Sequence, residues 1–195
     1  AAPDLVRTHP EVCAYAARTN NLDNLEWARE CGCEWGNANS AAASGGHLEV
    51  LEWLYAHGCP WSVSTCRDAA ANGQLDALQW LYAHNCPWGP ETCSRAAANG
   101  HFEVLQWAHA HGCPLDEWTC ARAAMRGRLD ILQWLRAHRC PWDHDTCDYA
   151  AMNGHIEVLQ WARAQNPPCP WTHQAIAGAE YDGNFEAADW CRAHG

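Results

Sequence analysis

Tryptophan and cysteine mark a hydrophobic repeat that runs along the chain. A first series of large apolar positions has members 26 to 29 residues apart, each with Leu, Phe or Ile five residues earlier: Trp27, Trp53, Trp80, Trp107, Trp134, Trp161 and Trp190. A second series follows the first by eight or ten residues, with a Cys two positions before each member: Trp35, Trp61, Trp88, Leu115, Trp142 and Trp171. A third series lies five residues after the second slot, at Cys13, Cys66, Cys93, Cys120 and Cys147. A unit of about 27 residues in about seven copies is typical of a solenoid.

Each copy predicts two short helices, which we name helix A and helix B. Helix A starts after the second-series slot, where capping residues stand at Ser62, Asp116, Asp143 and Thr172, and where Gly89 precedes Pro90. It ends at a glycine suited to a left-handed turn: Gly46, Gly73, Gly100, Gly127, Gly154 or Gly183. Helix B opens with an acid, which suits the helix dipole: Asp23, Glu49, Asp76, Glu103, Asp130, Glu157 or Glu186. It closes in most copies with a histidine, which also suits the dipole: His57, His84, His111, His138 or His194.

The apolar positions of helix B cover more than one narrow stripe, which indicates that the helix is flanked by neighbours on two sides. We therefore expect an all-α fold, a right-handed α-solenoid of about seven helix–turn–helix repeats in a single domain over residues 1–195. The expected units span residues 4–32, 33–58, 59–85, 86–112, 113–139, 140–168 and 169–195.

The end copies depart from the interior pattern. The interior copies have Ala-Ala at the close-packed turn of helix A, whereas the last copy has Ala179-Glu180, so we expect no repeat to stack on its far side. In the first copy Asn20 replaces the glycine, and Leu5-Val6 is expected to be the tail of a preceding helix. The second copy is one residue short, which leaves open whether Asn39 or Ser40 occupies the third-series Cys slot.

The segments Thr65–Leu78 and Ala97–Leu105 resemble the Ala-Ala-x-x-Gly-His-Leu-Glu-Val-Val core of ankyrin repeats. The resemblance extends over essentially the whole chain. It departs between the helices, where the ankyrin unit of 33 residues carries a β-hairpin finger and this chain has only Trp-x-x-x-Thr-Cys. We expect the finger to be replaced by about one more turn of helix A. The resemblance implies a binding scaffold and not an enzyme.

Composition and charge narrow the possible partners. The 195 residues carry 12 Lys+Arg against 23 Asp+Glu, a formal net charge of −11, so the basic footprint that nucleic acid requires is missing. No uninterrupted apolar run reaches the roughly 18 residues of a membrane span.

The chain does not begin with Met, and we expect residue 1 to be the edge of a longer protein. The 13 Cys are odd in number and periodic, which favours a reducing, intracellular location in the cytoplasm or nucleus.

Metal binding is a competing hypothesis, since 13 Cys and 12 His are present. Zinc sites bring Cys pairs together through short spacings such as C-x2-C, whereas the spacing repeated here is Cys-x6-Cys, as in Cys59 and Cys66. Thiols that are buried as small apolar side chains explain the pattern, so we expect no metal and no cofactor. Disulfides between the two Cys series stay open as an alternative. Cys31, in Cys31-Gly32-Cys33, and Cys191, near the expected exposed end, are the candidates for reactive thiols.

No pattern of catalytic residues recurs in the sequence. The acids are spread one per copy at helix starts, and neither a nucleophile–base set nor a glycine-rich phosphate loop is present. The histidines at helix ends are explained by the dipole, with a pH switch as the alternative. We therefore expect no enzyme and assign no catalytic residue.

Variation between copies predicts where a partner binds. Positions three, six, seven and ten after the second-series slot lie on one face of helix A and are not dictated by the repeat. The predicted partner-binding residues on this face are Arg95, Trp118, Arg122, Met125, Asp145, Asp148, Tyr149, Met152 and Tyr181. Asp145 and Asp148 are expected at the rim. Aromatic residues, Met and Arg are enriched at interface centres, so we expect a monomeric scaffold that binds a protein partner.

Several alternatives stand beside this prediction. Trp118 could fold back into the volume that Leu115 leaves where other copies have Trp. Met125 and Met152 could be enlarged Ala sites that contact the next helix. For the chain as a whole, the alternatives are a metal-binding or redox-active protein that uses the Cys series, and a structural spacer without a specific ligand.

Overall fold

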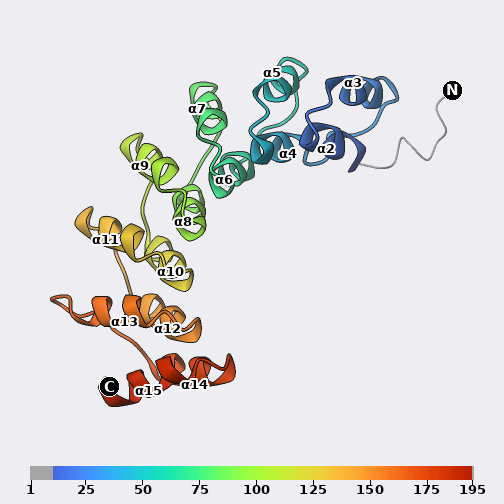
Figure 1. Ribbon diagram of the computed structural model, residues 1–195. Helices are drawn as coiled ribbons and strands as arrows, with labels where there is room; N and C mark the ends of the chain where they lie inside the picture. Colours follow the sequence, from blue (N-terminus) through green and yellow to red (C-terminus); the bar gives the residue numbers. More distant parts are fainter. Residues whose placement is uncertain (1–10, 195) are drawn as a thin grey trace. The chain divides into compact units, whose positions relative to one another are not determined.

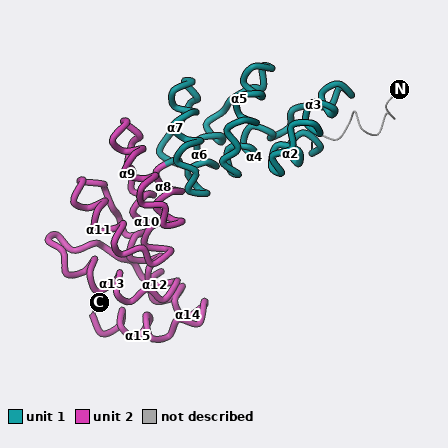
Figure 2. The backbone as a smooth tube through the Cα atoms, turned by 45° about the horizontal axis from the view of Figure 1, so that its top comes forward, with its two compact units in different colours: residues 1–92 teal, residues 93–195 magenta. Residues whose placement is uncertain are grey.

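The computed structural model describes residues 11–194, so the expectation for Leu5-Val6 falls outside the described residues. Within that range the chain forms fourteen helices and no strand. It comprises two compact units, Ala1–Thr92 (unit 1) and Cys93–Gly195 (unit 2), which are coloured separately in Figure 2. The expected single domain stays a prediction.

A and B helices alternate along the chain, as the repeat predicts. The A helices are α2 (Glu11–Arg18), α4 (Ala38–Gly45), α6 (Val63–Ala71), α8 (Pro90–Asn99), α10 (Glu117–Met125), α12 (His144–Met152) and α14 (His173–Tyr181). The B helices are α3 (Leu22–Glu30), α5 (Leu48–Ala56), α7 (Leu75–Ala83), α9 (Phe102–Ala110), α11 (Leu129–Ala137), α13 (Ile156–Arg163) and α15 (Phe185–His194). Within each unit the A helices follow one another along one side and the B helices along the other (Figure 1). The prediction of an all-α repeat solenoid is confirmed.

Local capping chemistry sets where the A helices begin and end. Asp116 caps α10, because its Oδ1 accepts the Thr119 N–H at 3.0 Å. Pro90 is the first residue of α8, as predicted. Ser62 occupies the N-cap position of α6 without a side-chain capping bond. The glycines that end the A helices have positive φ, and so does Asn20 (φ 53°), which replaces the glycine in the first copy.

Small side chains let successive A helices approach closely. In unit 1, α2 packs on α4 and α4 on α6, and in unit 2, α10 packs on α12 and α12 on α14. Fully buried Ala and Cys line these contacts, among them Cys66, Ala69 and Ala70 of α6, and Cys120, Ala123 and Ala124 of α10. Successive B helices make fewer backbone approaches, since they carry larger residues. A dense column of A helices therefore forms the rigid side of each unit.

The buried cysteines link neighbouring copies through hydrogen bonds. In unit 1 the Cys66 thiol lies 3.9 Å from the Cys86 carbonyl oxygen, and the Cys86 thiol lies 3.7 Å from the Ser62 carbonyl oxygen. In unit 2 the Cys140 thiol reaches the Asp116 carbonyl oxygen at 3.2 Å. Cys86 and Cys140 thus contact the start of the preceding A helix, as does Cys169, whose thiol lies 3.3 Å from the Asp143 carbonyl oxygen. Thiols fit here because they pack as small apolar groups and still donate weakly.

The same contact decides which residue of the second copy takes the Cys slot. The backbone N–H of Cys66 bonds the sulfur of Cys86, and the backbone N–H of Asn39 bonds the sulfur of Cys59 in the equivalent way. The Asn39 side chain also donates to the Pro60 carbonyl oxygen at 2.5 Å. Asn39, and not Ser40, therefore occupies the slot.

In four copies a second polar link joins the residue after the helix A glycine to the preceding copy. Its side chain donates to the main-chain carbonyl oxygen near the end of the previous A helix. In unit 1 the pairs are His47 with Arg18 at 2.9 Å and Gln74 with Ser44 at 3.3 Å. In unit 2 they are His155 with Met125 at 3.1 Å and Asn184 with Met152 at 2.6 Å. Carbonyls that the helix leaves unpaired are thereby satisfied by the next copy.

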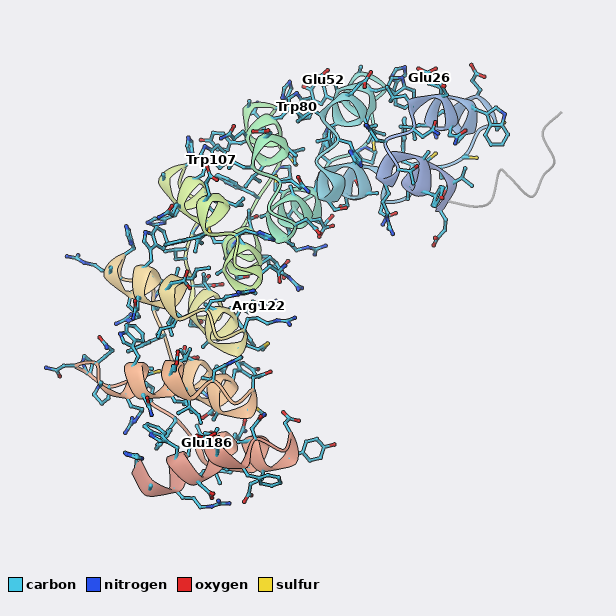
Figure 3. The ribbon with its side chains drawn as sticks, viewed as in Figure 1. Glu26, Glu52, Trp80, Trp107, Arg122 and Glu186 are labelled. Carbon is cyan, nitrogen blue, oxygen red and sulfur yellow. The ribbon has the colours of Figure 1, made fainter. Side chains whose placement is uncertain are left out.

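The first-series tryptophans are half-buried or, for Trp27, exposed, and they form a band along the B helices. Figure 3 shows Trp80 on α7 and Trp107 on α9 on the side of the B helices. In five copies the indole stacks on the histidine four residues later, with centroid distances of 3.9 to 4.3 Å: Trp53–His57, Trp80–His84, Trp107–His111, Trp134–His138 and Trp190–His194. Each of these histidines also bonds the main-chain oxygen of its tryptophan through Nδ1 at 2.8 Å. The histidines predicted at helix ends therefore have a packing role.

Neighbouring aromatic residues complete the contacts of Trp134. Its ring centroid lies 5.8 Å from Phe102, 5.6 Å from His109 and 4.0 Å from His138, so it bridges α9 and α11. We expect Trp134→Ala to lower the free energy of unfolding by about 2–4 kcal/mol, less than for a fully buried indole. Chemical denaturation of the purified protein measures the change. Gln133→Ala, at an exposed position of the same helix, is the control; equal stability of the two variants would contradict the stacking described here.

Candidate partner-binding surface

The predicted binding residues lie on A helices of unit 2. Arg95 is on α8, Trp118 and Arg122 are on α10, and Tyr149 is on α12. In Figure 3 Arg122 projects from α10 on the side away from α11. We call the exposed and half-buried members of the set the recognition face: Arg95, Trp118, Arg122, Met125, Asp145, Tyr149, Met152 and Tyr181.

Three side chains form the centre of this face. The rings of Trp118 and Tyr149 lie 6.2 Å apart and are tilted by 31°, so the two aromatic side chains join α10 to α12 across the surface. The Arg122 guanidinium carbon lies 5.9 Å from the Trp118 ring centroid, within cation–π range. Burial raises the pKa of the Tyr149 hydroxyl, as does the nearby Asp145 carboxylate, while Arg122 acts in the opposite direction. The phenol is therefore neutral over the physiological range.

Trp118 is at the surface and does not refill the position of Leu115. Its side chain is 44% exposed, and the described ring contacts are with Tyr149 and Arg122. A tryptophan that replaced the missing second-series indole would be half-buried beside the B helices, as its counterparts are. The alternative of a folded-back Trp118 is therefore wrong.

The two methionines differ from that aromatic centre. Met152 lies over Gly178 of α14, where an added Cβ would be only 2.5 Å from the Met152 Cε atom. Met152 thus contacts the next helix, as the alternative interpretation held, while its half-buried side chain also belongs to the recognition face. Met125 is half-buried at the end of α10. Both flexible thioethers can adapt to an incoming side chain.

Asp148 was expected at the rim, and that expectation is wrong. Its side chain is only 2% exposed, and its carboxylate accepts the Thr172 N–H at 2.8 Å and the Thr172 hydroxyl at 2.6 Å. Thr172 in turn caps α14, accepting the Gln174 N–H at 3.1 Å. Asp148 therefore joins α12 to the start of α14, because slot six of the helix faces the following copy. Asp145 is half-buried, with the His144 ring 3.7 Å from its carboxylate.

The two outer members of the predicted set are free of the central cluster. Arg95 is exposed on α8, in the slot that Arg122 occupies on α10. Tyr181 is 92% exposed at the end of α14. The structure shows no ring contact between Tyr181 and other described residues.

Sequence reasoning missed an aromatic group on unit 1. Tyr15, on α2, is 68% exposed in the slot of Tyr149, and with Trp27, Val12 and Ala16 it lines an open groove of about 480 Å³. Its position in the repeat, equivalent to that of Tyr149, is the sequence signal that identifies Tyr15.

The cysteines are placed as separate thiols, nearly all of them buried. All thirteen fall in the described part of the chain and are free thiols, and twelve of them are buried. No cluster of three potential ligands among His, Cys, Asp and Glu occurs in residues 11–194. Cys191, expected near an exposed end, is fully buried, because α15 turns it onto the preceding helices; burial raises its pKa to about 11.

Comparison with known proteins agrees with this architecture. Two overlapping stretches, residues 93–136 and 120–163, match the family of ankyrin repeats in many copies. Solved structures of 180 chains are similar to the fold. One is the human ASB11 ankyrin repeat domain, with a TM-score of 0.60, 17% sequence identity, and coverage of 76% of this chain and 80% of that chain. No curated protein matches the sequence. None of the helices described is both long and apolar enough to cross a bilayer.

Burial predicts a single rapidly reacting thiol. All thirteen cysteines lie in the described part of the chain, and only Cys31 among them is partly exposed. For a buried thiol such as Cys59, burial raises the pKa to about 11, which disfavours the thiolate. We expect iodoacetamide at neutral pH to modify Cys31 first and the other twelve only when the chain opens, since the thiolate is the nucleophile. Mass spectrometry of the labelled protein locates the sites, and complete labelling in guanidinium is the control. Labelling of Cys191 as fast as Cys31 would show that α15 is not docked.

The Asp148–Thr172 link predicts a stability effect that a rim residue would not have. Asp148→Ala leaves the Thr172 N–H and hydroxyl without their acceptor, and we expect a loss of about 2–4 kcal/mol in unfolding free energy. Hydrogen exchange should show the loss concentrated in α14 and α15. Asp145→Ala removes a neighbouring carboxylate of the same charge and should change stability little; similar losses in both variants would exclude a specific role for Asp148.

Proposed function

We propose that the chain is a protein–protein interaction scaffold. Its residues 93–163 match the ankyrin repeats, and its fold is that of an ankyrin-repeat domain. The partner is a protein that docks on the recognition face of unit 2. Ankyrin repeats are in general interaction modules, and the present residues supply the specific surface.

The exposed Trp118 carries this proposal. A 44% exposed indole next to Tyr149 and Arg122 brings together three residue types that dominate binding energy at interface centres. The repeat does not require a large residue at this slot, since other copies have Ser64, Glu91, Asp145 or Gln174 there. Neither packing nor capping explains the indole, so recognition is the role that fits it.

The A helices suit recognition because they present their side chains from a rigid backbone. α10 and α12 are held by their close contact, and α12 and α14 by the Asp148–Thr172 bonds as well. A surface that is already ordered loses little conformational entropy when a partner binds.

The other classes receive less support from the described residues. A metal or redox protein would need accessible or clustered thiols, whereas twelve cysteines are buried as packing groups. A spacer would not need an exposed aromatic cluster. We further infer a monomer and a reducing, intracellular compartment; the thirteen free thiols support the assignment of the compartment. The ankyrin-repeat fold is typically not catalytic, and we assign no reaction.

Binding of the partner tests the proposed face. A protein captured with this chain from its native cells is purified, and its affinity for wild type and for Trp118→Ala/Tyr149→Ala is measured by calorimetry. We expect affinity to fall by about 100-fold or more, since each residue has hot-spot character. The matched control is Gln133→Ala/Gln160→Ala, at exposed positions of the B helices of the same unit. Undiminished binding to a folded Trp118→Ala/Tyr149→Ala variant would refute the assignment.

A further inference from the structure

Two exposed aromatic side chains lie on neighbouring B helices of unit 1. Trp27 on α3 is 50% exposed, and Tyr55 on α5 is 48% exposed. Unlike the stacked first-series indoles, Trp27 makes no ring contact within residues 11–194. With Tyr15 it lines the open groove of about 480 Å³ at the edge of the unit. These helices therefore present an apolar surface that the fold leaves uncovered.

Carboxylates that the fold does not use stand beside these rings. The first-turn acids Asp23 and Glu49 suit the helix dipole, but Glu26 and Glu52 lie further along α3 and α5. Figure 3 shows both glutamates on the B-helix side of the unit. Both are exposed, and neither forms an ion pair with any described residue.

The acids of α3 and α5 weaken the helices that carry them. Glu26 lies three residues after Asp23 and four residues before Glu30, and Glu52 lies three residues after Glu49, so like charges adjoin on each helix. Glu30 ends α3, where a negative charge opposes the helix dipole. A neutral residue suffices for the repeat, because copies three to six have glutamine in the slot of Glu26: Gln79, Gln106, Gln133 and Gln160. Architecture therefore does not explain the charge.

Little positive charge opposes these acids. Among the B helices of unit 1 only α3 carries an arginine or lysine, and this Arg29 lies over the Trp35 ring at 3.8 Å. Arg18 and Arg67 belong to A helices of the unit, and Arg67 is paired with Asp68. The field along α3 and α5 is therefore negative and favours a cation.

We propose that this surface is a second docking site, which binds a basic segment of a protein partner, rich in Arg or Lys. We call it the acidic face, and its residues are Glu26, Trp27, Glu30, Glu49, Glu52 and Tyr55. Arginine and lysine stems pack on aromatic rings while their charged groups reach the solvent side, where Glu26 and Glu52 accept them.

Charge complementarity selects this occupant. An acidic segment or a nucleic acid would be repelled, and so would a second copy of the chain, whose net charge is −11. The acidic face lies wholly within unit 1, whereas the recognition face lies in unit 2. The proposal therefore adds a second surface to the proposed function and does not depend on the first.

Selection from a library of random displayed peptides tests this chemistry. The immobilised full chain selects peptides, and the variant Glu26→Gln/Glu52→Gln removes those that bind elsewhere. This variant should fold, because it places in both slots the residue that four other copies have there. We expect the recovered peptides to be enriched in Arg and Lys, and their affinity to decrease with ionic strength, because the contact is between charges.

Matched variants separate the acidic face from the general charge of the chain. Glu26→Gln/Glu52→Gln should weaken the recovered peptides by about fivefold or more, and Trp27→Ala by about threefold or more. The control Glu103→Gln/Glu157→Gln removes the same charge from exposed positions of other B helices and should leave affinity within about twofold. Circular dichroism and the thermal midpoint verify that each variant is folded.

Three outcomes would overturn the inference. These are recovered peptides without basic enrichment, equal weakening by the control variant, and displacement of the peptides by millimolar magnesium chloride at constant ionic strength, which would indicate a site for small cations. The scaffold proposal is tested separately, since binding of the native partner to Trp118→Ala/Tyr149→Ala concerns the recognition face alone.

Discussion

Close packing between successive A helices is the constraint on which the rest of the structure depends. The helices meet through Ala and Cys side chains that are fully buried, such as Cys120, Ala123 and Ala124 of α10. Larger residues at these slots would separate the helices and break the thiol and side-chain links between copies. The B helices, in contrast, tolerate bulk, and the tryptophan–histidine stacks fill the wider space there. The A-helix side of each unit is therefore closely packed through small residues, and the B-helix side is filled by large ones.

Hydrogen bonds between copies then fix the register of the A helices, whose close approach the small residues allow. Several copies supply a thiol to the start of the preceding A helix and a side chain to its end. These are the places where a helix leaves main-chain groups unpaired. A copy is therefore incomplete without its neighbour, which accounts for the repeated Cys without any metal or redox chemistry.

Much of the fold could be predicted from sequence, because the residues that set the starts and ends of helices recur in each copy. The repeat length, the helix bounds, Pro90 at the start of α8 and the glycine stops all follow from local chemistry that recurs in each copy. The individual exceptions could not be predicted in this way. Asp148 and Asp145 look alike in sequence, yet slot six faces α14 and slot three faces outward, a difference set by the packing of two helices. Trp118 likewise had two possible volumes to occupy, and only the position of Tyr149 on the next helix decides between them. The burial of Cys191 depends on how α15 docks, which no local pattern records.

The separation of slots on one helix has an evolutionary consequence. On α10, the fully buried residues Cys120, Ala123 and Ala124 pack against the neighbouring helices, whereas Trp118 is exposed and Arg122 projects on the side away from α11 (Figure 3). Mutations at the second set can diversify specificity while the first set preserves the architecture. A lineage can therefore acquire new ligands by drift at a few codons, and duplication of one copy adds a fresh, independently variable position to the array.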